Sequence, residues 1–538
     1  MKTVIKGVPG GGKTTSLLNL IANNFDPRET MFVSFTRDAI IEARKRAMEK
    51  WGIEKSEIKY FRTLHSICFR LMGLTREDIF SESDIESFFK SFGIKYVKKS
   101  ILKSIEEGEE FVADSYEEES DGNRLLGIIN YIKHVYKISP LDIKSDELKS
   151  MLASFIYKND IKFKNSLLNN INHLADIVIE YEKRKEEKVD YTDTLLKFLK
   201  NPVIDENIKY LVVDEFQDLS PLMYEIIKFF ESKTKEQVYA GDEQQCIFTF
   251  LGASKKFLIK EFNEANVRTV LEETKRMRKF IAEFAERYAI KNMKNKIGAI
   301  KSNLDGGEVH KVFNINLVHF ENLDVFFLHR SNRQKKEWKK KLIEEGIRFK
   351  ELGFGKRIWT ESLDKIYSAI LKIKNGEKVK DDELKELIEV IPTDPFLIRG
   401  VKTKLRKGEF IDFFGNRLKE FSVDFINKNF FQYQNINYIV ENLKALKIDK
   451  DRLEALRIKL LRNPKPIGNE CLKIGTIHSV KGMEANIVIL NCEVPKKIMK
   501  RWKEVWEDEA SVYYVGITRA KEKLFLLEWL KNPLFNGL

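Results

Sequence analysis

The sequence has 538 residues, more than one hydrophobic core usually holds, because domains typically contain about 100–200 residues. Its composition is globular, with 43% hydrophobic and 33% charged residues, and no apolar stretch reaches the roughly 18 residues that span a membrane. The net charge of +13 fits a phosphate-rich partner such as nucleic acid, although a solvated, lysine-rich surface explains it equally well. Four scattered cysteines without a CxxC pair, and no signal peptide, predict a cytoplasmic protein.

The chain opens with a predicted strand, Thr3–Ile5, followed by a glycine-rich turn and a helical pattern. The turn reads GVPGGGKT and matches the phosphate-binding pattern GxxxxGK[ST], whose backbone N–H groups bind phosphate oxygens at a helix N-terminus. The lysine would reach the β and γ phosphates of a nucleotide, and the Thr14 hydroxyl would ligate Mg²⁺. A plain strand-to-helix turn is the alternative. The motif supplies these candidate nucleotide ligands: Gly7, Gly10, Gly12, Lys13, Thr14 and Thr15.

A second buried strand, Tyr210–Val213, ends at Asp214 and Glu215. A phosphate-binding loop needs such carboxylates: Asp214 would hold Mg²⁺, commonly through water, and Glu215 would polarise the attacking water. The distance of about two hundred residues between the two motifs is too great for one minimal nucleotide-binding domain. We therefore expect a large insertion between them.

Further segments follow in an order and spacing that resemble the superfamily 1 helicases of the UvrD/Rep/PcrA type over nearly the whole chain. The resemblance rests on VSFTRDAIIEARKRA, FRTLHSICFRLMG, LVVDEFQDLSP, YAGDEQQCIFTFLGA, LEETKRMRKFI, LKIGTIHSVKGMEANIVIL and SVYYVGITRAKEKLFLL. It implies an α/β fold with two RecA-like P-loop NTPase lobes, each carrying a mostly helical insertion.

The resemblance also divides the chain. The first lobe would use residues 1–75 and 186–273, with an insertion at 76–185. The second lobe would use residues 274–355 and 466–538, with a short insertion at 356–465. Further strands are expected at Met31–Phe35, Gln237–Ala240, Val267–Leu271, Val325–Leu328, Lys473–Thr476 and Ile487–Leu490.

The resemblance assigns further roles around the nucleotide. Arg276 and Arg519 would reach across a cleft from the second lobe and neutralise the γ-phosphate in the transition state, a contact worth about 10³–10⁵ in rate. For both arginines, a surface ion pair is the alternative. Gln245 would sense the γ-phosphate and signal to the nucleic-acid site. The remaining nucleotide-site candidates are Gln217, Asp242, Gly482 and Glu484.

Aromatic residues near the motifs suggest base stacking, which contributes roughly 1–3 kcal/mol per base and tolerates any sequence. Core packing is a serious alternative, because the chain contains 38 phenylalanines. Two histidines lie in similar T-[LI]-H-S segments and, by resemblance, contact the strand backbone. The nucleic-acid candidates are Phe35, Thr36, Thr63, His65, Phe248, Phe250, Thr476 and His478.

Three departures from the family pattern stand out. Only Met1–Lys6 precede the glycine turn, so the glutamine segment that reads adenine is absent. Lys275 stands where the family has a stacking tyrosine, and Leu251 stands where it has an arginine. The first two departures remove expected adenine contacts, so the sequence predicts relaxed nucleotide choice.

The sequence therefore predicts an ATP- and Mg²⁺-dependent DNA helicase or translocase, stimulated by single-stranded DNA and moving 3′ to 5′. Its partners would be single-stranded DNA and single-strand/duplex junctions, without a membrane, and the protein would be monomeric in isolation. Alternatives are a protein-stripping translocase that does not unwind, a nucleotide-switched DNA-binding or loading protein with little turnover, and a motor acting on RNA.

Overall fold

The structure is a computed structural model that describes residues 1–34, 37–97, 120–294, 298–315, 323–345, 347–352, 359–412, 414–462 and 472–538. The chain divides into two compact units. The first contains Met1–Val318, Phe327–Arg333 and Thr476–Leu538, and the second contains His319–Phe326 and Gln334–Gly475. Within the described ranges, no helix has both the length and the apolar character that crossing a bilayer requires.

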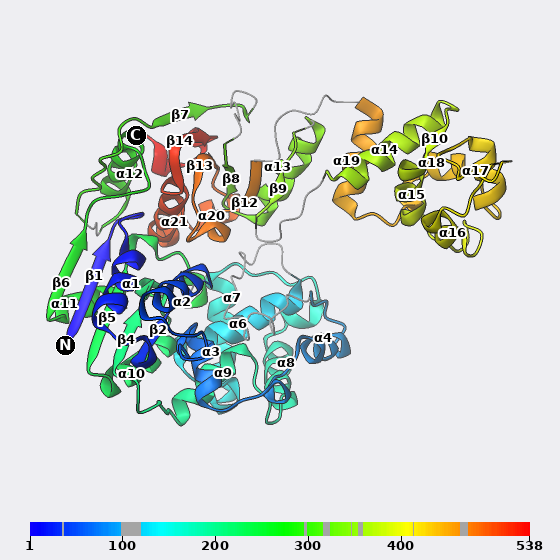
Figure 1. The fold of residues 1–538 in the computed structure, drawn as a ribbon. Coiled ribbons are helices and arrows are strands. Elements are labelled where there is room, and N and C mark those ends of the chain that lie inside the picture. Colours follow the sequence, from blue (N-terminus) through cyan, green and yellow to red (C-terminus); the bar gives the residue numbers. More distant parts are fainter. Residues whose placement is uncertain are drawn as a thin grey trace. The chain divides into compact units, whose positions relative to one another are not determined.

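Among the described strands, six form a first sheet in the order β3-β2-β4-β5-β1-β6. All five pairings in it are parallel, and the inner strands β2 and β4 are almost wholly buried, as in parallel sheets covered on both faces. The N-terminal strand pairs with two strands from more than two hundred residues later (Figure 1). The strands are β1 (Lys2–Gly7), β2 (Thr30–Val33), β3 (Phe61–Arg62), β4 (Tyr210–Val213), β5 (Glu236–Gly241) and β6 (Val267–Leu271).

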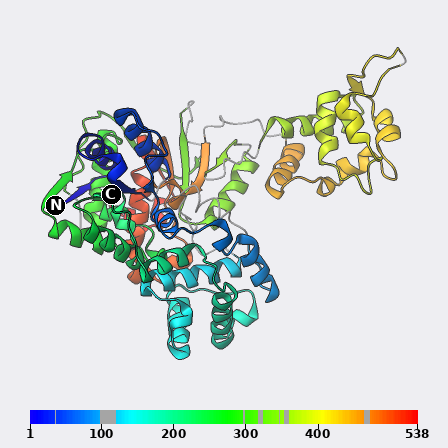
Figure 2. The same cartoon turned by 60° about the horizontal axis from the view of Figure 1, so that its bottom comes forward.

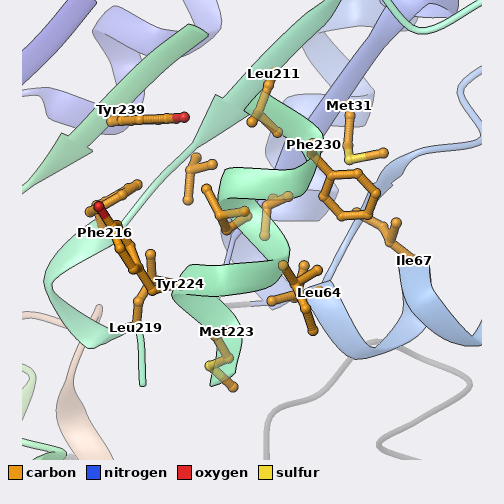
Figure 3. Close-up of a cluster of buried hydrophobic side chains, with 14 of the residues drawn as sticks. Met31, Leu64, Ile67, Leu211, Phe216, Leu219, Met223, Tyr224, Phe230 and Tyr239 are labelled. Atoms are coloured by element: carbon orange, nitrogen blue, oxygen red, sulfur yellow. The ribbon is translucent and has the colours of Figure 1, made fainter. Parts of the chain in front are cut away.

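Helices pack on this sheet through apolar faces. The face of α10 carries Met223, Ile227 and Phe230, which join a cluster with Leu211 of β4 and Leu64 of α3 (Figure 3). Ser220 caps this helix, because its hydroxyl accepts a hydrogen bond from Met223 N. The helices are α1 (Lys13–Asn24), α2 (Arg37–Trp51), α3 (Leu64–Leu71), α9 (Tyr191–Lys200), α10 (Pro221–Lys233) and α11 (Lys256–Glu264).

The described part of the first insertion is helical and has a core of its own. Its helices are α4 (Glu82–Ser91), α6 (Asp121–Tyr136), α7 (Ser145–Lys158) and α8 (Ile171–Arg184), and they lie together as a group in the turned view (Figure 2). At its base, Lys133 and Lys185 are buried with three carboxylates, those of Glu182, Asp190 and Asp193. The two ammonium groups already neutralise most of this negative charge, so the cluster reads as a structural ion-pair network.

A second six-stranded sheet of the described chain has the order β7-β14-β13-β8-β12-β9. Its strands are β7 (Glu308–Val312), β8 (Val325–His329), β9 (Lys350–Glu351), β12 (Leu472–Thr476), β13 (Ala485–Asn491) and β14 (Ala520–Leu527). One helix, α12 (Lys279–Asn292), precedes β7. Further helices of this part of the chain are α13 (Asn332–Glu344), α20 (Lys496–Lys500) and α21 (Trp502–Ile517). The buried helix α21 runs directly into the segment before β14, which positions Arg519.

The second unit includes a small helical domain with its own apolar core. Its elements are α14 (Glu361–Lys374), β10 (Val379–Lys380), α15 (Asp381–Val390), α16 (Val401–Lys407), β11 (Glu420–Phe421), α17 (Val423–Phe430), α18 (Ile436–Glu441) and α19 (Lys450–Arg462). The antiparallel pair β10–β11 joins helices that bury Leu363, Leu384 and Ile426.

The predicted α/β fold built on two parallel sheets is confirmed. Each predicted strand is found with an end shifted by at most two residues where it is described; β2 ends at Val33, and Phe35 lies outside the described residues. Four strands of the two sheets, β3, β7, β9 and β14, were not among the predictions. The four-part division of the chain stays a prediction.

Candidate functional site

The glycine-rich loop follows the strand β1, which lies between β5 and β6, and leads into α1, as the motif predicts. Gly10 and Gly12 have φ angles of 72° and 81°, which favour glycine. Lys13 is buried, and its Nζ donates to the carbonyl oxygens of Gly7 at 2.7 Å and Val8 at 3.3 Å. The loop thus holds a buried ammonium at a helix N-terminus, where a phosphate is stabilised.

The two candidate carboxylates lie beside the loop. The Thr14 hydroxyl donates to Asp214 Oδ2 at 2.6 Å. Burial raises the pKa of Asp214 to about 6, and the neighbouring charge of Glu215 adds to this rise. Burial acts on Glu215 in the same direction, but the positive charges of Lys481 and Lys13 outweigh it and lower its pKa. A buried carboxylate, that of Asp214, and the half-buried carboxylate of Glu215 lie beside a hydroxyl and are hard oxygen ligands, so these residues fit Mg²⁺.

A chain of amide contacts leads from Glu215 to the next strand. Glu215 has a left-handed backbone conformation with φ of 51°, a strained geometry that is common at functional sites. Gln217 is fully buried; its Nε2 donates to Glu215 Oε2 at 2.5 Å, and its Oε1 accepts from Asp242 N at 2.9 Å. Asp242 in turn accepts from Gln245 Nε2 at 2.7 Å.

Arg519 reaches the same network from the short segment between α21 and β14. Its side chain is buried, and its Nη2 donates to Gln245 Oε1 at 2.7 Å. The guanidinium also donates to the carbonyl oxygens of Val515 at 3.1 Å and Met483 at 3.2 Å. Burial and the charge of Arg276 lower the pKa of Arg519 to about 9, so the group remains a cation at neutral pH.

Arg276 lies against the glycine loop. A Cβ on Gly10 would lie 2.5 Å from the Cβ of Arg276, and Thr274 and Lys275 bond to the carbonyl oxygens of the loop. The Arg276 side chain donates to Glu484 Oε2 at 2.8 Å. Gly482, two residues before Glu484, has a φ of 83°.

Most of the sequence-predicted nucleotide residues take part in the contacts described above. Thr15 is exposed on the first turn of α1. The catalytic and nucleotide-binding roles of these residues stay predictions.

The nucleic-acid candidates fall into two groups. Phe248 and Phe250 are half-buried and lie 6.3 Å and 5.6 Å, between ring centroids, from His478. Phe250 and His478 line a cavity of about 300 Å³ together with the cations Lys158, Arg330, Lys497 and Arg501. Three carboxylates, those of Glu504, Asp508 and Glu509, line the same cavity, and Arg330 and Arg501 form ion pairs with two of them. The cavity thus offers an aromatic ring and cations, which suit a nucleic-acid strand, beside carboxylates.

The other group is buried and structural in position. Thr63 caps α3, and Thr476 Oγ1 accepts from Ser479 N at 3.3 Å. His65 stacks on Tyr191 with ring centroids 3.8 Å apart, and its two ring nitrogens have no hydrogen-bond partner among the described residues. Phe35 and Thr36 lie outside the described residues. Nucleic-acid contacts by these residues stay predictions.

Sequence reasoning missed four residues of the site. Lys481 and Asp218 form a buried ion pair, Thr274 Oγ1 donates to Pro9 O at 2.8 Å, and Arg330 lines the cavity while bonding Glu509. Lys481 and Asp218 lie inside quoted motifs, so their position was a usable signal. Nothing in the sequence marks Arg330.

Comparison with known proteins agrees with this geometry. The profile of the UvrD/REP helicase N-terminal domain matches residues 1–266, and that of the UvrD-like helicase C-terminal domain matches residues 416–530. Similar proteins include a probable DNA helicase II homolog of Mycoplasma pneumoniae, 25% identical over 96% of this chain and 80% of that protein. An ATP-dependent DNA helicase Rep of Buchnera aphidicola is 22% identical over 96% and 88%. An ATP-dependent DNA helicase PcrA of Staphylococcus aureus is 24% identical over 56% and 40%. The two matched domains, in this order and on this fold, show that the chain belongs to the UvrD/Rep family of helicases, which are ATP-hydrolysing enzymes.

Proposed function

We propose that the protein is an ATP-dependent DNA helicase or translocase, which hydrolyses ATP faster on single-stranded DNA, moves 3′ to 5′ and separates duplex ahead of it. The similar proteins named above are DNA helicases. The observation that carries the proposal is the hydrogen bond between Arg519 and Gln245, because it joins a candidate arginine finger to the segment that leads to the cavity.

The candidate nucleotide residues support stepwise roles in hydrolysis. Lys13 would bind the β and γ phosphates, while Thr14 and Asp214 would hold Mg²⁺, which neutralises phosphate charge when bound. Glu215, kept ionised by Lys481 and Lys13, would accept a proton from the attacking water or orient it. Arg519 and Arg276 would stabilise the charge that develops on the γ-phosphate.

The cavity supports binding of a single strand. Lys158, Arg330, Lys497 and Arg501 would contact phosphates, and Phe250 would stack on a base. These contacts carry no sequence preference, as a motor that moves along DNA requires. They also discriminate poorly between DNA and RNA, so the choice of strand needs direct measurement.

The test is strand displacement on duplexes that carry a single-stranded tail at either the 3′ or the 5′ end. The proposal expects ATP-dependent displacement from the 3′-tailed duplex only. Streptavidin removal from a biotinylated strand without displacement would favour the protein-stripping translocase. Nucleotide-dependent DNA binding with negligible phosphate release would favour the switch. Displacement of RNA alone would favour an RNA motor.

A further inference from the structure

Lys481 is a buried lysine on the loop after the short helix His478–Val480. Its side chain is 7% exposed, and its Nζ pairs with Asp218 Oδ2. The same Nζ donates to the main-chain oxygen of Gln245 at 2.8 Å and lies 4.9 Å from the centroid of the Phe248 ring. One ammonium group thus makes three contacts with two other segments of the chain, one at Asp218 and one at Gln245 and Phe248.

Two of these contacts lead toward the nucleotide site. Gln245 is held on its side chain by Asp242 and Arg519 and on its main chain by Lys481. Asp218 ends the short segment that begins with Asp214. Lys481 therefore links the segment that ends at Asp218 to the segment that contains Gln245. Because it bonds the main chain of Gln245, the side chain of Gln245 stays available to Arg519.

The remaining contact leads toward the cavity. Phe248 and His478 lie 6.3 Å apart between ring centroids, and His478 lines the cavity three residues before Lys481. The other end of this loop is tied to the nucleotide side, because Arg519 donates to Met483 O at 3.2 Å and Arg276 to Glu484. The seven residues 478–484 therefore run from the cavity to both candidate arginine fingers.

Stability alone does not account for a lysine at this point. A buried ion pair stabilises a fold little, since desolvation of both charges offsets their attraction, and an apolar pair often does as well. Such a pair can instead select one arrangement among several, because its geometry is specific and its rupture is costly. The contacts of Lys481 with Asp218 and with the Gln245 main chain meet this condition.

We propose that Lys481 is a positioning residue, which holds Gln245 toward Arg519 and transmits occupation of the cavity by a nucleic-acid strand to ATP hydrolysis. This inference rests on the proposed function. Asp218 is its partner, and the ion pair holds the ammonium group of Lys481 against the segment that begins with Asp214. A strand that moves Phe248 or His478 changes the position of Lys481, and thereby that of Gln245.

The test measures kcat and KM for ATP, with and without oligo(dT), in the full chain. Lys481→Met should lower the stimulation by oligo(dT) about tenfold, within the range of coupling energies between sites, and lower the unstimulated kcat at an unchanged KM. Lys481→Arg should restore most of the stimulation, because it keeps the charge. Lys255→Met is the matched control: it breaks another ion pair of this unit, with Glu507 at 2.6 Å, without contacting Gln245.

The pair itself is tested by a double-mutant cycle. Asp218→Asn should reduce the stimulation less than Lys481→Met, since Lys481 keeps its bond to Gln245. The double variant should show the same stimulation by oligo(dT) as Lys481→Met alone. If the substitutions instead impaired folding in general, the losses of the two single variants would add in the double variant, and KM would rise. Wild-type kcat and stimulation in Lys481→Met would overturn the inference.

Failure of the proposed function gives a different pattern. A wild-type chain that hydrolyses ATP at the same rate with and without oligo(dT) would contradict stimulation by DNA and, with it, transmission through Lys481. The unstimulated kcat would then still test the position of Gln245, and an unchanged kcat in Lys481→Met overturns it. Because Lys481 also lowers the pKa of Glu215, a lower kcat at an unchanged KM supports the inference only if Gln245→Ala lowers kcat as well and the double variant with Lys481→Met falls no further.

Discussion

Arg519 donates a hydrogen bond of 2.7 Å to the side-chain oxygen of Gln245, although 274 positions separate the two residues in the sequence. The side-chain amide of Gln245 also donates to Asp242, and the main-chain N of Asp242 donates to Gln217. The side-chain amide of Gln217 in turn donates to Glu215. A continuous line of hydrogen bonds thus joins a buried arginine to a half-buried carboxylate beside the glycine-rich loop.

Arg519→Ala should lower the ATP hydrolysis rate by about 10³-fold or more while nucleotide affinity changes little, because an arginine finger acts mainly in the transition state. Arg519→Lys should remain slow, since a lysine cannot reproduce the forked contacts. Single-turnover hydrolysis and binding of a fluorescent nucleotide measure the two effects. Arg278→Ala is the control, because Arg278 is exposed and donates to the Asp305 carbonyl. Equal losses in both alanine variants would contradict the assignment.

Gly10→Ala should abolish nucleotide binding. The added Cβ would meet the Cβ of Arg276 at 2.5 Å, at a φ of 72° that L residues rarely adopt. The control is Gly73→Ala, whose φ of 67° is similar but whose Cβ meets nothing within 4 Å. Both variants should lose about 1 kcal/mol of stability from the backbone, and only Gly10→Ala should lose affinity in equilibrium nucleotide titration. Full affinity in Gly10→Ala would show that the loop moves away from Arg276 without cost.

Lys133→Met should destabilise the first unit by about 3–5 kcal/mol, because it leaves three buried carboxylates with one lysine. Lys133 is fully buried and bonds Glu182, Asp190 and Asp193 at 2.7–2.9 Å. Lys137→Met, four residues later on an exposed pair with Glu225, should cost less than about 1 kcal/mol. Urea unfolding followed by fluorescence gives both values, and similar midpoints for the two variants would contradict the role of the cluster.

Acid should destabilise the fold through His65. Burial, with the nearby His134 adding to it, lowers the pKa of His65 well below its usual value. The unfolded chain binds a proton near pH 6.5 while the folded chain does not, so stability is complete above this pH and falls below it. Between pH 7.5 and 5.5 this residue should cost about 1.4 kcal/mol. His65→Phe keeps the ring on Tyr191 and should remove that part of the pH dependence in urea unfolding. An unchanged dependence in the variant would show that His65 is protonated in the folded state.

Local patterns predicted much of the fold. The strands β1 and β4 were predicted from short apolar runs that end in functional motifs. The glycine-rich loop was predicted from the spacing of its glycines and lysine, which is typical of phosphate binding. The strand β14 was missed because Ala520–Leu527 starts with charged residues, although its second half is buried against β13. Neighbours on other strands, rather than its own residues, make that segment a strand.

The site was predictable residue by residue but not contact by contact. The motifs named Arg519 and Gln245 separately, and nothing in either segment shows that they bond each other. The Lys481–Asp218 pair went unnoticed because an ion pair across 263 positions leaves no periodic signal. His65 and His478 have similar local sequences, yet His478 lines the cavity with Phe250 and His65 does not, because the surrounding tertiary structure differs.

The most direct test of the account is phosphate release from ATP with and without single-stranded DNA, measured for the wild-type chain and for Lys13→Ala. The account predicts slow release by the wild-type chain alone, strong stimulation by DNA, and no release by the variant under either condition. Equal rates with and without DNA would contradict the proposed link between the cavity and the nucleotide site. Release by Lys13→Ala at the wild-type rate would contradict the assignment of the glycine-rich loop as the phosphate-binding site.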